Sequence, residues 1–126
     1  MTEFPRPRLI ICTKCCAGRP LEGGAPTPGA RLLAALERLL DGAMAPVDLR
    51  SVSCLANCDR GCSGAIAMPG KWTYLLGLLA PEHAADLITY GAAYAASANG
   101  TVLPSRRPAS LQHAIMGRVP PMEAVP

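Results

Sequence analysis

The six cysteines of this chain lie in two short clusters, and this distribution constrains the fold more than any other feature. The first cluster is residues 12–16 (CTKCC), and the second is residues 54–62 (CLANCDRGC). Thiolates bind soft metal ions and iron–sulfur clusters, so two cysteine loops of this kind indicate one shared four-sulfur site. The rest of the chain must therefore fold so that these two distant segments meet.

Spacing favours one set of four ligands within these clusters. Cys12 and Cys15 have two residues between them, which lets both thiolates reach one metal. Cys54 and Cys58 have three residues between them, a spacing that an irregular loop can accommodate. We therefore predict that Cys12, Cys15, Cys54 and Cys58 bind the metal or cluster.

The two remaining cysteines are alternates. Cys16 directly follows Cys15, and the side chains of neighbouring residues usually diverge, so Cys16 is expected to be a spare thiol. On a helix Cys62 would share a face with Cys54 and Cys58, but Gly61 and Gly64 predict a loop here. In such a loop Cys62 is either a nearby fifth thiol or the fourth ligand, and both options stay open.

Length and charge restrict the class of protein. A chain of 126 residues can bury a core without disulfides, and residues 1–8 contain no signal-peptide core, so we expect a cytoplasmic domain. The alanine-rich run 84–99 is too short for a membrane span. A net charge of +3, without a basic stripe, argues against nucleic-acid binding. No serine, histidine and acid set suggests hydrolysis, so we expect a binding or electron-transfer protein rather than an enzyme.

Hydrophobic patterns predict an α/β fold. Residues 8–11 form a strand that ends at Cys12, and Thr27-Pro28 begins a helix that Pro46 terminates. Residues 47–52 alternate as a half-buried strand and lead to Cys54. A right-handed crossover makes these two strands parallel, so their ends meet at one edge of the sheet.

The second half of the chain adds to this sheet. Residues 65–68 and 71–76 are predicted to form a hairpin around Pro69-Gly70, followed by a helix from Pro81 to Asn99-Gly100. The expected architecture is a four-stranded mixed sheet with two main helices. From Pro104 onward the recurring prolines predict an irregular tail. We therefore divide the chain into a metal-binding or cluster-binding domain, 1–103, and a Pro-rich C-terminal tail, 104–126.

Basic residues accompany the cysteine segments. Lys14, Arg19, Arg60 and Lys71 are predicted to form a positive rim that offsets thiolate charge and suits an acidic redox partner. Gly61 and Gly64 are expected to let backbone amides approach the cluster closely. No membrane partner is expected, and a homodimer is left open.

The cysteine order and the topology resemble the thioredoxin-like [2Fe–2S] ferredoxins and the related small subunit of respiratory complex I. More specifically, residues 11–15 (ICTKC), 54–62 and 69–74 (PGKWTY) resemble a bacterial family of predicted metal-binding proteins of unassigned function. Many members of that family are encoded beside cobalamin-biosynthesis genes. The resemblance covers most of residues 8–121.

The resemblance implies a thioredoxin-like fold and a [2Fe–2S] cluster held by Cys12, one of Cys15 or Cys16, Cys54 and Cys58. It implies one-electron transfer, in a reductive step linked to cobalt or cobalamin metabolism. Three alternatives remain: a structural Zn²⁺ bound by four thiolates, a metallochaperone that uses Cys16 or Cys62 as a transient ligand, and a thiol–disulfide oxidoreductase that uses Cys12 and Cys15.

Overall fold

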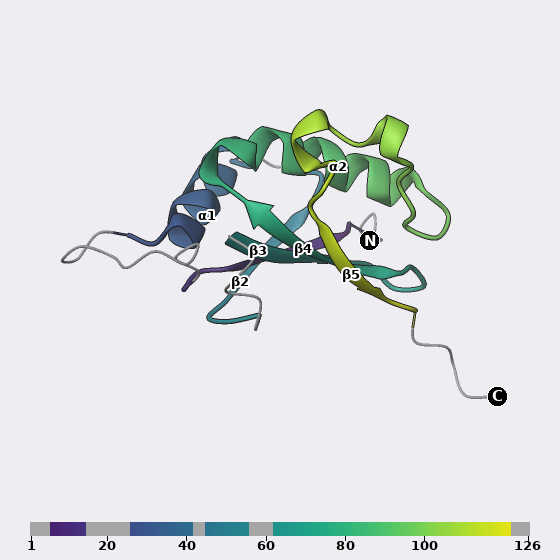
Figure 1. The fold of residues 1–126 in the computed structure, drawn as a ribbon, viewed down its shortest axis with the longest axis horizontal. Coiled ribbons are helices and arrows are strands. Elements are labelled where there is room, and N and C mark those ends of the chain that lie inside the picture. The colour runs from purple at the N-terminus through teal and green to yellow at the C-terminus, as the bar shows by residue number, and fades with distance from the viewer. Residues whose placement is uncertain (1–5, 15–25, 42–44, 56–61, 122–126) are drawn as a thin grey trace, which may run out of the picture.

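The computed structural model describes residues 6–14, 26–41, 45–55 and 62–121 (Figure 1). Within these residues a single sheet has five strands in the order β2-β1-β3-β4-β5. The strands are β1 (Arg8–Cys12), β2 (Asp48–Val52), β3 (Cys62–Ala67), β4 (Thr73–Leu79) and β5 (Ile115–Val119). The two α-helices of the described chain, α1 (Pro28–Leu39) and α2 (Ala84–Ala96), lie on the same side of the sheet (Figure 1).

The first half of the chain forms the predicted β1-α1-β2 crossover. The helix α1 begins at Thr27, whose side-chain oxygen accepts a hydrogen bond from the backbone N–H of Ala30 at 2.9 Å. Such a cap satisfies an N–H group that the helix itself leaves unpaired. Leu32 and Leu36 are fully buried, and they fix α1 on the sheet. The strands β1 and β2 then pair in parallel, as expected.

The hairpin of β3 and β4 is also present, but β3 begins earlier than the sequence suggested. Gly70 has a φ of 77° in the turn between the two strands, a conformation that glycine adopts at little cost. Cys62 and Gly64, which were predicted to lie in a loop, are both within β3. The loop prediction was wrong because the run from Cys62 to Ala65 consists of small residues that fit a fully buried strand.

The segment after Pro104 corrects the predicted fold in a second place. Residues Ile115–Val119 form β5, which pairs antiparallel with β4, so the sheet has five strands where four were expected. Leu111 and Ala114, just before β5, are buried in the core. The prolines suggested an irregular tail, but they lie beside β5 and not within it. They therefore remove none of the ladder hydrogen bonds that a proline inside the strand would remove.

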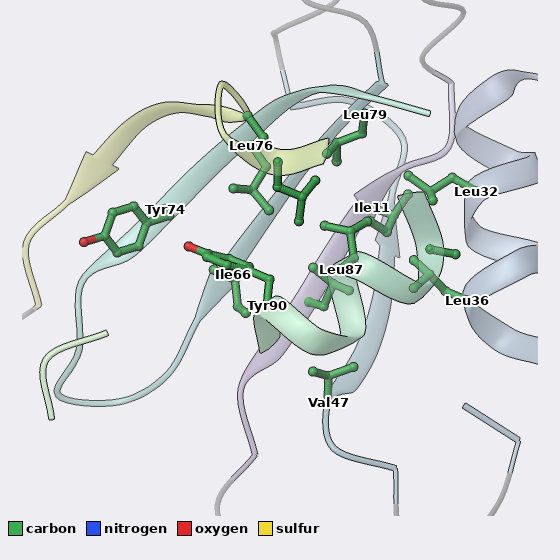
Figure 2. Close-up of a cluster of buried hydrophobic side chains, with 14 of the residues drawn as sticks. Ile11, Leu32, Leu36, Val47, Ile66, Tyr74, Leu76, Leu79, Leu87 and Tyr90 are labelled. Atoms are coloured by element: carbon green, nitrogen blue, oxygen red, sulfur yellow. The ribbon is translucent and has the colours of Figure 1, made fainter. Parts of the chain in front are cut away.

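Buried apolar side chains from the sheet and both helices form one core (Figure 2). In Figure 2 side chains from β1, β3 and β4 point toward those from the two helices, and the labelled residues are Ile11, Leu32, Leu36, Val47, Ile66, Tyr74, Leu76, Leu79, Leu87 and Tyr90. Burial of this kind is the main driving force for the fold. No helix in the described part of the chain is long and apolar enough to cross a bilayer.

Candidate metal centre

The ends of β1 and β2 bring the two cysteine segments together. Because the two strands are parallel, their last residues, Cys12 and Val52, are ladder partners. Cys54 lies only two residues beyond Val52. The structure thus places Cys12 and the start of the second cysteine segment at one edge of the sheet.

The thiol of Cys12 points toward the segment that carries Cys54. Its Sγ donates a hydrogen bond to the backbone carbonyl of Ser53 at 3.5 Å, and Ser53 directly precedes Cys54. Cys12 is 3% exposed, whereas Cys54 is exposed to solvent. The edge therefore combines a sheltered thiol with an accessible one, an arrangement that suits a centre partly open to a partner.

Cys62 lies at the same end of the sheet as Cys12. It is the first residue of β3 and has no exposed surface. Ile11 pairs with Gly64 across the β1–β3 ladder, so these two residues share a face. Side chains alternate along a strand, so Cys62 follows Gly64 on the face of β3 that meets the core. Cys12 and Cys62 both belong to the buried apolar cluster, so burial alone does not distinguish their roles.

Three of the predicted or alternate ligands cannot be placed. Cys15, Cys16 and Cys58 lie outside the described residues. Among the residues that the structure does describe, no group of three or more His, Cys, Asp or Glu side chains is arranged to hold a metal ion. The thiols of Cys12 and Cys54 nevertheless fit a thiolate-ligated centre, because two chain segments each contribute a sulfur ligand of the required type at one edge.

A network of hydrogen bonds around Thr13, which the sequence did not indicate, joins the elements at this edge. The backbone N–H and the hydroxyl of Thr13 both donate to the carbonyl of Val52, at 2.8 and 3.2 Å. The hydroxyl of Thr27 donates to the carbonyl of Thr13. The sequence identified Thr27 as a helix cap, but its second bond depends on the tertiary structure.

The predicted positive rim is wrong for Lys71. Lys71 follows the turn between β3 and β4, at the opposite end of the sheet from Cys12. Its Nζ donates to the carbonyls of Ala95 at 2.6 Å and Tyr94 at 3.4 Å, so it caps the last turn of α2. Burial raises the pKa of Tyr94 to about 12, which keeps its hydroxyl protonated and able to donate to the Trp72 carbonyl. Arg19 and Arg60 lie outside the described residues.

In the part of the chain that the structure describes, two cations lie at the cysteine edge. Lys14 directly follows Thr13 and is exposed. Arg31, which the sequence analysis overlooked, is exposed in the first turn of α1, where its backbone N–H donates to the Thr27 carbonyl at 2.9 Å. The sequence could have placed Arg31 at this edge, because Arg31 closely follows the capping residue Thr27 and α1 begins at the cysteine edge. Among the described residues, these two cations add positive charge to this edge.

A hollow in the surface lies elsewhere. It has a volume of about 360 Å³ and is lined by residues that include Arg6, Glu37 and Asp48. These residues surround the start of β2 and the end of α1, at the opposite end of the strands from Cys12. The hollow is therefore separate from the cysteine site.

Comparison with known structures agrees with this architecture. The chain is similar to a thioredoxin-like [2Fe–2S] ferredoxin from Aquifex aeolicus, with a TM-score of 0.58 over 94% of this chain and 96% of the other. The two sequences are 11% identical, so the likeness defines the fold, which is thioredoxin-like. The chain itself belongs to the family described as proteins of unknown function (DUF1636), which matches residues 9–121. No curated protein matches the sequence significantly.

Proposed function

We propose that this protein is a small electron carrier that holds a [2Fe–2S] cluster between its two cysteine segments. The observation that carries the proposal is the meeting of Cys12 with the Cys54 segment, through the Cys12 Sγ hydrogen bond to the Ser53 carbonyl. The likeness of the fold to a thioredoxin-like [2Fe–2S] ferredoxin supports it. When bound, such a cluster supplies reversible one-electron chemistry.

The proposed ligands are Cys12, Cys15, Cys54 and Cys58. This choice follows the spacing of the cysteines in the sequence, and Cys62, which like Cys12 belongs to the buried apolar cluster, is the alternate ligand. Cys12 and Cys54 come from segments whose starting points are fixed by the β1–β2 ladder. Fixed ligands let the protein keep the same geometry in both oxidation states, which favours fast electron transfer.

The first prediction concerns the metal. Protein expressed with adequate iron and purified without oxygen is expected to be brown, to absorb in the visible range and to contain about two irons and two acid-labile sulfides per chain. Reduction with dithionite is expected to give an EPR signal from the one-electron reduced cluster. The measurements are the visible spectrum, the iron and sulfide content, and the EPR spectrum.

Other outcomes of this experiment would contradict the proposal. Stoichiometric zinc without acid-labile sulfide would select a structural Zn²⁺ site of four thiolates. A folded protein that remains colourless and iron-free after anaerobic reconstitution would exclude the cluster. The protein contains the same six cysteines whichever metal it binds, so a difference in the number of thiols cannot account for either result.

We further propose that the redox partner is acidic where it contacts the cysteine edge. Lys14 and Arg31 are both exposed there, and α1 also directs its positive N-terminal end toward Thr13. A negatively charged surface would be steered toward this edge and away from the far end of the molecule. Cobalamin-related reduction stays a prediction, and cob(II)alamin is one acceptor to include in kinetic assays.

The second prediction tests this charge with small oxidants of known sign. Arg31→Glu is expected to slow oxidation of the reduced protein by ferricyanide by about threefold or more at low ionic strength, and to speed oxidation by a cationic cobalt(III) complex. Arg38→Glu is the matched control, because Arg38 is exposed in the last turn of the same helix. Stopped-flow rates at low and high salt measure both effects. Equal changes in the two variants would show that the cysteine edge is not where electrons leave.

A further inference from the structure

We infer that Thr13 and Thr27 form a clamp that sets the relative position of the two cysteine segments, and that Thr27 is a positioning residue for the metal centre. The inference rests on the proposed function, and it assigns a role to two side chains that bind no metal themselves. The clamp consists of the hydrogen bonds of Thr13 to Val52 and of Thr27 to Thr13 and Ala30.

Thr13 is the junction of this clamp. It lies inside the first cysteine segment, directly after Cys12, and both its backbone N–H and its hydroxyl donate to the Val52 carbonyl. This pair of bonds occupies both lone pairs of one carbonyl oxygen at the end of β2. Since Val52 lies two residues before Cys54, the bonds fix the start of one cysteine segment against the start of the other.

Thr27 connects a third structural element, the helix α1, to the clamp. Its hydroxyl uses its only hydrogen to donate to the Thr13 carbonyl, and its oxygen accepts from the Ala30 N–H at 2.9 Å. The same side chain thus caps α1 and ties the helix to the cysteine segment. A helix cap alone requires only the second of these bonds. The bond to Thr13 therefore serves the cysteine edge.

The clamp acts on the thiols through the backbone. Cys12 and Cys54 flank the clamped residues, and Lys14, which precedes Cys15 in the sequence, directly follows the clamped Thr13. Residues that orient metal ligands in this way commonly change metal affinity 10- to 100-fold when they are replaced, at roughly constant ligand chemistry. We therefore expect loss of the Thr27 hydroxyl to weaken metal binding without removing any ligand.

The test is a Co²⁺ titration of the reduced apoprotein, followed by the sulfur-to-cobalt absorption bands, together with the rate of iron loss from the reconstituted protein. Thr27→Val is expected to weaken Co²⁺ binding about tenfold and to speed iron loss by a similar factor. Thr27→Ser, which keeps the hydroxyl, is expected to restore both values. Thr13→Val removes only the side-chain bond to Val52, and a smaller change of the same sign is expected.

A matched control separates positioning from general destabilisation. Thr101→Val removes a hydroxyl that contacts the Tyr74 hydroxyl at 3.1 Å, near the end of the sheet opposite Cys12. It is expected to lower the melting temperature of the apoprotein but to leave Co²⁺ affinity and iron loss unchanged. A folded Thr27→Val protein with wild-type Co²⁺ affinity would overturn the clamp while leaving the proposed function intact. A wild-type protein that binds neither iron nor Co²⁺ would overturn both.

Discussion

Cys54→Ser is expected to abolish the cluster, with the purified protein retaining less than about a tenth of the wild-type iron. The physical reason is that a serine hydroxyl remains protonated at neutral pH and is a poor ligand for the soft iron–sulfur centre. Cys54 is exposed, so its replacement removes little packing, and the apoprotein is expected to keep its melting temperature. Iron content, the visible spectrum and circular dichroism of the same sample measure the three quantities.

Cys62→Ala is the control that makes this result specific. Cys62 has no exposed surface and lies in the apolar core, so its replacement is expected to lower the free energy of unfolding by about 1 kcal/mol. Its iron content is expected to remain at the wild-type level. The opposite pattern, with iron lost from Cys62→Ala and kept in Cys54→Ser, would show that Cys62 is the fourth ligand.

The crossover could be predicted from the sequence because local and global signals agree there. The Thr27-Pro28 start signal and the leucine pattern define α1, a short apolar run defines β1, and alternating apolar and polar residues define β2. A right-handed β-α-β connection then has one common arrangement, which places the ends of both strands at one edge. The meeting of Cys12 with the Cys54 segment follows from these rules alone.

Cys62 and Gly64 show where local patterns failed. Glycine and small polar residues usually mark a loop, but in β3 they serve a strand that must approach its neighbour closely. Only the tertiary structure shows that β1 supplies that neighbour. The same limit applies to Lys71, whose proximity to the cysteines in sequence is unrelated to its position beside the end of α2.

The fifth strand was missed for a related reason. Residues Ile115–Val119 contain a glycine and an arginine and have no clear alternation, so their pairing depends on the exposed edge of β4. The side chain of Arg118 lies over the Trp72 ring, 4.1 Å from its centroid, which adds a favourable contact at this pairing. Such a contact between distant residues cannot be read from the composition of either segment.

Gly64→Ala is expected to lower the free energy of unfolding by about 2 kcal/mol and the melting temperature by roughly 8 °C. A Cβ atom at this position would lie 2.9 Å from the backbone carbonyl oxygen of Ile10 and 3.3 Å from Cδ1 of Ile11. The strand β1 is held between β2 and β3, so its backbone cannot withdraw without breaking ladder hydrogen bonds. Thermal and urea unfolding of the apoprotein measure the effect.

Gly117→Ala is the matched control for this variant. Gly117 is also in a strand, but a Cβ atom there would meet its nearest neighbour, Cδ1 of Leu75, at an ordinary 4.0 Å. This change is expected to leave stability unchanged or to raise it by about 0.5 kcal/mol, because alanine restricts the unfolded chain. The loss in Gly64→Ala is expected to be the same with and without metal, since the glycine serves the contact of β1 with β3. A loss of stability that appears only in the metal-loaded protein would instead support the role first predicted from the sequence. In that role Gly64 lets the backbone approach the cluster closely.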